Sequence, residues 1–158
     1  MSDILVAYFS ATGTTARVAE KLGALLGADL YRIVPEVPYT GADLNWHDAH
    51  SRSSIETKDP EARPAISGGI KDISSYKKVF IGFPIWWYRE PKIIDTFLES
   101  EDFHGKEIIP FATSGASPLG KTAQYMRELV KDAVVKEGKR LTPRMTDAEL
   151  KDWASSCL

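Results

Sequence analysis

The sequence predicts an α/β fold of three layers, in which helices cover both faces of a five-stranded parallel sheet. Short continuous apolar runs, typical of strands buried on both faces, alternate along the chain with stretches of helical apolar spacing. This alternation favours parallel strands joined by right-handed crossovers. The strand order 2-1-3-4-5 fits five such strands and places a ligand crevice at the carboxyl ends of the first and third. The 158 residues suit one domain spanning residues 1–158.

The strands are expected where apolar residues run without interruption. The second strand is edge-like and is expected to stop at Pro35 and Pro38, because proline cannot donate to a sheet. Pro110 lies inside the fourth strand and counts against it for the same reason. The expected strands cover residues 4–9, 30–34, 79–83, 108–112 and a short segment between 133 and 141.

The helices are expected where apolar residues recur three and four positions apart. Gly27 stands where a glycine ends the first helix, and Pro91 lies in the first turn of the second. Residues 146–149 have the spacing of a capping box at the start of the last helix. The apolar stripes are Val18, Leu22, Leu25 and Leu26; Ile93, Ile94, Phe97 and Leu98; Tyr125, Met126, Leu129, Val130 and Ala133; and Leu150, Trp153, Ala154 and Cys157.

The connection from Glu36 to Lys78 departs from this alternation. It is long and polar, and it is interrupted by Pro60, Pro64 and the glycine pair at 68–69. A structureless connection of this length is unusual in a compact domain, so we expect it to be functional or partly helical.

The bulk composition excludes several classes of function. A formal net charge of −2 provides no basic field, so neither nucleic acid nor a membrane is an expected partner. The longest apolar run, residues 79–88, is too short to span a bilayer. The single cysteine, Cys157, forms no intrachain disulfide, and a cytoplasmic location is the default. No metal site is expected, because the spacing of the histidines does not suit one: His47, His50 and His104.

A loop rich in hydroxyl groups joins the first strand to the first helix. Unsatisfied N–H groups at a helix N-terminus attract anions, and Gly13 lets the backbone approach one closely. The lysine of nucleotide P-loops and the GxGxxG of dinucleotide loops are both missing, which favours a phosphate monoester held by neutral donors. The alternative is a hydroxyl-rich helix cap without a ligand. The candidate phosphate-binding residues are Ser10, Ala11, Thr12, Gly13, Thr14 and Thr15.

Two further loops follow the third and fourth strands. Three consecutive aromatic residues would be costly in water, and a flat heteroaromatic ligand would give them stacking partners, although each alone could equally cap the core. The loop after the fourth strand is small and polar, and suits the hydrogen-bonding edge of such a ligand. All three loops are expected at one edge of the sheet, which indicates one site. The candidates are Pro84, Ile85, Trp86, Trp87 and Tyr88, and Thr113, Ser114, Gly115, Ala116 and Ser117.

These segments resemble the flavodoxin family. Residues 4–22, which include Tyr-Phe-Ser-Ala-Thr-Gly-Thr-Thr, are similar to the FMN-phosphate signature, and residues 82–86 are similar to the loop that places an aromatic ring against the flavin. The whole chain most resembles the bacterial flavodoxin-like subfamily with a long connection before the third strand. By this resemblance the cofactor is FMN, with its phosphate on residues 10–15, its isoalloxazine beside 84–88 and its pyrimidine side beside 113–117. Further resembling segments are 43–46, 51–54, 63–64, 113–115 and 137–140.

Three departures from the family pattern bear on function. The loop after the fourth strand continues Ser117-Pro118-Leu119 without a second aromatic ring, so one flavin face is open or covered by the connection, for example by Trp46. Flavodoxins are usually strongly acidic, whereas the net charge here is −2. No glycine lies between Trp86 and Pro91, so a turn with a positive φ angle, and with it a redox-linked peptide flip, is not expected there.

Two uses of a bound flavin compete. The first is a low-potential electron carrier serving redox partner proteins, because no nicotinamide or substrate domain is evident. The second is an NAD(P)H-dependent flavin or quinone reductase, which an open flavin face would permit; a domain that has lost its cofactor is a third possibility. Arg89 either lies near the flavin and favours its reduced anion, or only solvates the rim, where it can pair with Glu90 or Asp95. The chain is expected to be a monomer or a weak dimer.

Overall fold

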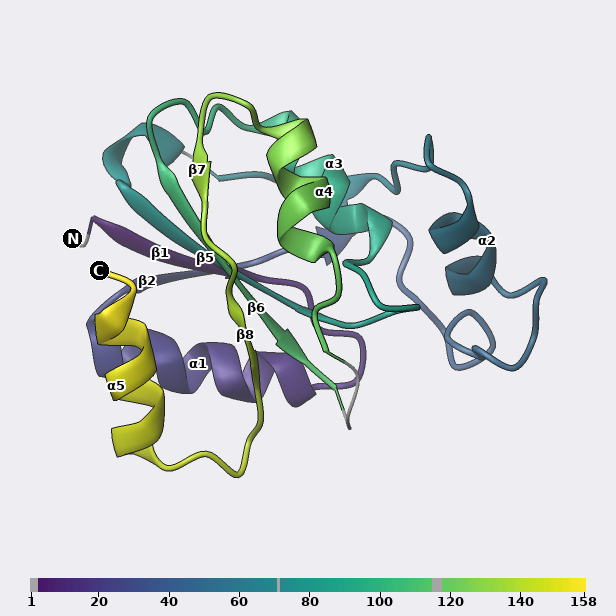
Figure 1. Ribbon diagram of the computed structural model, residues 1–158. Coiled ribbons are helices and arrows are strands. Elements are labelled where there is room, and N and C mark those ends of the chain that lie inside the picture. Colours follow the sequence, from purple (N-terminus) through teal and green to yellow (C-terminus); the bar gives the residue numbers. More distant parts are fainter. Residues whose placement is uncertain (1–2, 71, 115–117) are drawn as a thin grey trace.

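The central sheet is parallel and lies between two layers of helices (Figure 1). The computed structural model describes residues 3–70, 72–114 and 118–158. The strand order is β2-β1-β5-β6, and β7 and β8 both pair with β6 on its far side, which confirms the predicted order 2-1-3-4-5. The strands are β1 (Ile4–Tyr8), β2 (Asp29–Arg32), β5 (Lys78–Pro84), β6 (Glu107–Thr113), β7 (Val134–Val135) and β8 (Lys139–Leu141).

The helices cover both faces of this sheet. In Figure 1, α1 (Thr14–Leu26) and α5 (Asp147–Ser156) lie below it, and α3 (Lys92–Ser100) and α4 (Thr122–Leu129) lie above it. The alternation of a strand sends Leu5 into the cluster with α3 and α4, and its neighbour Val6 into the cluster with α1 and α5. The predicted three-layer arrangement is therefore confirmed.

The helix ends agree with the sequence signals at three of the predicted positions. Gly27 ends α1 with a left-handed φ of 61°, Pro91 is the N-cap of α3, and residues 146–149 form the predicted capping box of α5. The prediction that the third helical stripe continues to Ala133 is wrong, because α4 ends at Leu129 and the chain turns there. The remaining members of the stripe still face the core from that turn. In the last helix, Trp153 and Cys157 are only half-buried.

The predicted second strand, residues 30–34, is two strands. β2 stops at Arg32, and the next residue contributes one more sheet contact, from its N–H to the carbonyl oxygen of Tyr8 at 2.7 Å. The chain then leaves the central sheet, and β3 (Val34–Pro35) pairs antiparallel with β4 (Ile66–Ser67). Pro35 is therefore part of a strand and not its stop.

The fifth strand is divided where it passes Pro110. In β6 the backbone N–H and C=O groups of successive residues point alternately toward the strands on either side. The carbonyl oxygen of Ile108 accepts a hydrogen bond from the N–H of Lys136 at 2.9 Å, so the backbone of Pro110, two residues on, also points toward β7 and β8. Proline has no N–H to offer there, and the pairing breaks between β7 and β8. Gly138 fills the break, since a Cβ at this position would lie 2.1 Å from the carbonyl oxygen of Pro110. One continuous short strand was therefore the wrong expectation, although Pro110 does belong to β6.

The long connection extends past the carboxyl ends of the strands (Figure 1). It contains β4, the short helix α2 (Arg52–Lys58) and the 3-10 turn η1 (Ile73–Ser75), which confirms that it is partly helical. Arg52 and Tyr39 hold it together, because Glu56 accepts hydrogen bonds from both side chains and the guanidinium lies 3.8 Å from the centre of the tyrosine ring.

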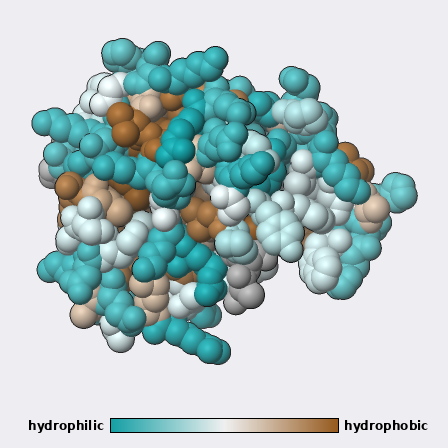
Figure 2. Space-filling view, viewed as in Figure 1, coloured by the Kyte–Doolittle hydropathy of each residue, from teal (hydrophilic) through white to brown (hydrophobic). Residues whose placement is uncertain are grey.

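The molecular surface is mainly hydrophilic on the face seen in Figure 2. No helix in the described part of the chain has the length and apolar character that a membrane span needs. Among the same residues, no cluster of three His, Cys, Asp or Glu side chains is placed to hold a metal ion.

Candidate functional site

The three predicted loops meet at the carboxyl edge of the sheet. The hydroxyl groups of Thr15 and Thr113 are 2.6 Å apart, which joins the first loop to the third. The N–H of Ile85 donates to the carbonyl oxygen of Thr113 at 3.2 Å, which joins the second loop to the third. The ring of Trp86 meets that of Phe9 edge-on, with centroids 5.7 Å apart, and this contact joins the second loop to the first.

Ser10 supports the first loop from inside. Its hydroxyl oxygen accepts hydrogen bonds from the N–H groups of Gly13 and Ala16, both at 3.1 Å, and so caps the N-terminus of α1. Gly13 has a φ of 98°, a conformation that residues with a Cβ rarely adopt. Because the hydroxyl of Thr15 is also buried against Thr113, two of the predicted phosphate-binding side chains are occupied within the protein.

The outward-facing donors of this loop are mostly backbone groups. Among the described residues, no acceptor is hydrogen-bonded to the N–H groups of Thr12, Thr14 and Thr15. The side chains of Thr12 and Thr14 are exposed beside them, at the positive end of the α1 dipole. Behind the loop, the guanidinium of Arg32 donates to the carbonyl oxygen of Ser10 at 3.3 Å. This arrangement suits a small dianion held mainly by neutral donors.

The second loop is a tight hairpin that we call the aromatic turn, residues 86–89. The N–H of Trp86 donates to the carbonyl oxygen of Arg89 at 3.1 Å, and the reverse bond is 3.3 Å. Between them Trp87 and Tyr88 have φ angles of 51° and 64°. Two central residues with positive φ make a turn of type I′, which normally requires Gly or Asn. The expectation that this glycine-free segment would avoid positive φ is therefore wrong.

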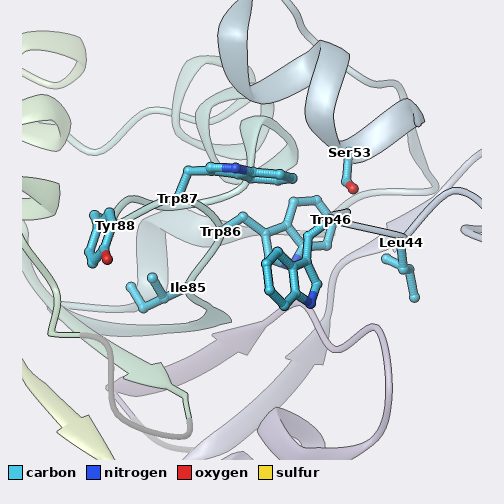
Figure 3. Close-up of a pocket in the computed structure, with 7 residues that line it drawn as sticks. All are labelled: Leu44, Trp46, Ser53, Ile85, Trp86, Trp87 and Tyr88. Carbon is cyan, nitrogen blue, oxygen red and sulfur yellow. The ribbon is translucent and has the colours of Figure 1, made fainter. Parts of the chain in front are cut away.

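A cleft of about 450 Å³ separates the aromatic turn from the connection. Figure 3 shows residues of the turn on one side and residues of the connection on the other. Trp46 is 67% exposed and Tyr88 is 65% exposed. Because one face of the Trp46 ring is stacked on His47, its other face and the ring of Tyr88 are available to a ligand or partner. The cleft is lined by Leu44, Trp46 and Ser53 from the connection and by Ile85, Trp86, Trp87 and Tyr88 from the second loop.

Two lining residues were missed from the sequence, Leu44 and Ser53. The connection has no periodic pattern that would indicate which side chains face the sheet. The only available signal was that both residues lie in segments that resemble the family, next to Trp46 and Arg52.

The third loop is described only at its start. Thr113 is buried, and the carbonyl oxygen of Ser114 accepts a hydrogen bond from the guanidinium of Arg140 at 3.0 Å. The predicted site residues Gly115, Ala116 and Ser117 lie outside the described residues.

Arg89 points into a buried group of charges. Its guanidinium lies 3.2 Å from the carboxylate of Glu90 and 3.6 Å from that of Asp95, and 4.0 Å from the centre of the Tyr125 ring. The expected pairing of Arg89 with these carboxylates is therefore confirmed, but its side chain is only 20% exposed and does not form a solvated rim. An effect of Arg89 on the flavin stays a prediction. Burial, followed by the hydrogen bond and charge of Asp95, raises the pKa of Glu90 to about 8.

The sheet order and the three adjoining loops place this protein in the flavodoxin-like class of α/β folds. A family model described as flavodoxin matches residues 3–157, and the chain belongs to the flavodoxin family. No curated protein matches the chain.

Several solved structures are similar over nearly the whole chain. A candidate flavoprotein from Bacteroides eggerthii has 51% identity and a TM-score of 0.92, and covers 98% of this chain and 96% of its own. One from Bacteroides uniformis has 43% identity and a TM-score of 0.91, and the match covers 96% of this chain and 97% of that protein. A flavoprotein from Lactobacillus acidophilus, solved in complex with FMN, has 22% identity, a TM-score of 0.73, and 96% and 97% covered, and shows likeness of fold.

Proposed function

We propose that the chain binds FMN and acts as a low-potential electron carrier. The observation that carries the proposal is the pairing of outward donors at the start of α1 with an aromatic cleft at the same edge of the sheet. Membership of the flavodoxin family supports it, and so does the FMN complex of the Lactobacillus acidophilus protein of like fold.

The first loop has the chemistry that the FMN phosphate needs. The N–H groups of Thr12, Thr14 and Thr15 and two exposed threonine side chains lie together at the start of α1, and Gly13 allows a close approach to the backbone. Ser10 contributes indirectly by holding the backbone in this shape. The loop lacks the lysine of nucleoside triphosphate sites, and a phosphate monoester can be held by neutral donors without it.

The cleft has the apolar walls that a flat ring needs. We assign the isoalloxazine to the surface formed by the second loop, with Trp46 of the connection in place of the aromatic ring missing after the fourth core strand. FMN, when bound, supplies redox chemistry in one- or two-electron steps. The protein binds and orients it, excludes water from part of its surface, and leaves a rim at Tyr88.

An exposed rim suits exchange of electrons with another molecule. For a carrier, that molecule is a redox partner protein that approaches the side chains of Trp46, Trp87 and Tyr88, all of which are exposed. The proposed carrier is a monomer or a weak dimer located in the cytoplasm.

The volume of the cleft favours a second candidate, an NAD(P)H-dependent flavin or quinone reductase. In this candidate the outer face of the flavin is open instead of being covered by Trp46, and a flat hydride donor or acceptor lies next to the ring in the cleft of about 450 Å³. In that case the chain would bind a nicotinamide directly and would need no protein partner.

Anaerobic reduction separates the two candidates. The protein is loaded with FMN and mixed with NADPH or NADH, and the visible absorbance of the flavin is followed. A carrier is expected to remain oxidised for minutes and to accept electrons from dithionite in two resolved one-electron steps. Rapid bleaching by a nicotinamide would contradict the carrier and support the reductase. Failure to take up FMN would contradict both.

A further inference from the structure

A cluster of charged side chains lies next to the aromatic turn, outside the proposed contacts with FMN. Three members are almost fully buried: the side chain of Glu90 is 0% exposed and those of Lys92 and Asp95 are 2% exposed. The cluster joins the connection, the turn and α3. Its members are Arg63, Arg89, Glu90, Lys92, Asp95 and Glu99.

Arg89 is held from several directions within this charge cluster. Its guanidinium stacks on the ring of Tyr125 from α4 and reaches the carboxylates of Glu90 and Asp95. Asp95 is itself held by Lys92, whose ammonium group lies 3.6 Å away. Ion pairs in a site of low dielectric are less screened than those at the surface, and a planar guanidinium stacked on a ring has little freedom to rotate.

The backbone next to Arg89 is in an unfavourable conformation. Trp87 and Tyr88 both occupy the left-handed region without being Gly or Asn, and such residues persist only where their surroundings over-determine them. The two hydrogen bonds between Trp86 and Arg89 close the turn but also form in turns that contain glycine. Two side chains hold the ends of this turn in place. The ring of Trp86 packs against Phe9 and Tyr39 at its start, and the side chain of Arg89 fixes its end, next to the two strained residues, to α3 and α4.

We propose that Arg89 is a positioning residue, which holds Trp87 and Tyr88 in their left-handed conformation and so aims the aromatic turn into the cleft. The guanidinium acts through the backbone of the turn and makes no contact with the ligand. The effect on the turn stands without FMN. The effect on FMN affinity rests on the proposed function.

Hydrogen exchange in the FMN-free protein tests the first effect. In Arg89→Met the amide of Trp86 is expected to exchange at least about tenfold faster, since the strain of two left-handed residues is no longer opposed. Arg63→Met is the matched control: it removes a cation of the same cluster that contacts Glu99 and Asp95 but not the turn. Unchanged exchange in Arg89→Met, or equal acceleration in both variants, would overturn the proposal.

A rescue experiment tests the second effect. Tyr88→Gly relieves the strain at this position, whereas Tyr88→Ala removes the same ring and keeps a Cβ. Adding Arg89→Met should weaken FMN binding about tenfold in the Tyr88→Ala background and about twofold or less in the Tyr88→Gly background. An equal loss in both backgrounds would show that Arg89 does not act through the turn.

Two further measurements keep the outcomes separate. Circular dichroism establishes whether each variant is folded. If Arg89→Met is unfolded, Arg89→Lys replaces it, since lysine keeps the charge but lacks the planar group over the Tyr125 ring. Arg89→Lys is then expected to accelerate the exchange of Trp86, and unchanged exchange would again overturn the proposal. If no variant binds FMN and exchange still responds to Arg89→Met, the proposed function fails and the positioning role stands.

Discussion

Glu90 has a buried carboxyl group beside that of Asp95, and the guanidinium of Arg89 lies 3.2 Å from it. Burial, reinforced by Asp95, raises its pKa from 4.5 to about 8. Charged groups that face this pair come from three segments: Arg89 from the turn, Lys92 from α3 and Arg63 from the connection. The pair formed by Glu90 and Asp95 in the folded protein therefore binds a proton over a pH range in which the unfolded chain has released it.

This proton makes stability depend on pH. From about pH 4.5 to about pH 8 the folded state binds more protons than the unfolded state, so the free energy of unfolding falls as the pH rises and levels off above this window. Glu90→Gln stays neutral and should remove that part of the slope. Urea unfolding of both proteins at several pH values measures it, with the more exposed Glu99→Gln as the control. A constant difference between wild type and Glu90→Gln across the window would contradict the assignment.

Substitution of Gly13 tests whether the loop at the start of α1 binds the phosphate. Its φ is 98°, and a Cβ there would meet no atom within 4 Å, so Gly13→Ala adds backbone strain without a clash. We expect a loss of about 1 kcal/mol in stability and weaker FMN binding. Gly27→Ala is the matched control, because Gly27 also has a positive φ and open space but lies at the other end of α1. Thermal unfolding should show similar losses of stability in the two variants, whereas FMN titration should show weaker binding only in Gly13→Ala. Equal FMN affinities of the two variants would contradict the assignment of the phosphate to this loop.

Among the elements, the divided fifth strand depends on a contact across the sheet. Pro110 interrupts the hydrogen bonding of β6, and the chain passes it only because Gly138 has no side chain. The division has a consequence for the site, since β8 places Arg140 where it binds the carbonyl oxygen of Ser114.

Gly138→Ala should therefore be severely destabilising. A Cβ at this position would lie 2.1 Å from the oxygen of Pro110, which is backbone and cannot move aside easily. Gly105→Ala provides the control, since its φ of 72° is similar and no atom lies within 4 Å. We expect Gly138→Ala to cost at least about 2 kcal/mol more than Gly105→Ala in denaturant unfolding. Equal costs would show that positive φ alone, and not the close approach, is what Gly138 provides.

For the whole molecule, the layers and strand order could be predicted because they follow from patterns along the chain. Apolar runs marked β1, β5 and β6, and helical spacing marked α1, α3 and α5. The features that could not be predicted depend on contacts between distant segments. Trp87 and Tyr88 adopt positive φ next to an arginine that is fixed by Asp95 and Tyr125.

For the candidate site, the position of the loops could be predicted from the sequence, but the contacts of their side chains could not. The loops follow strands, so their meeting at one edge could be foreseen, and the contact between Thr15 and Thr113 bears this out. The sequence could not show that the hydroxyls of Ser10 and Thr15 are used inside the protein, because hydrogen-bond partners depend on the fold. Nor could it indicate Leu44 and Ser53, since the connection lacks a regular pattern.

Titration of the ligand-free protein with FMN and with riboflavin tests the central claim most directly, because the two differ only in the phosphate. Quenching of flavin fluorescence measures both affinities. If the N–H groups at the start of α1 hold the phosphate, FMN should bind one to one, and riboflavin at least about a hundredfold more weakly. Equal affinities for the two flavins, or no binding of either, would contradict the account.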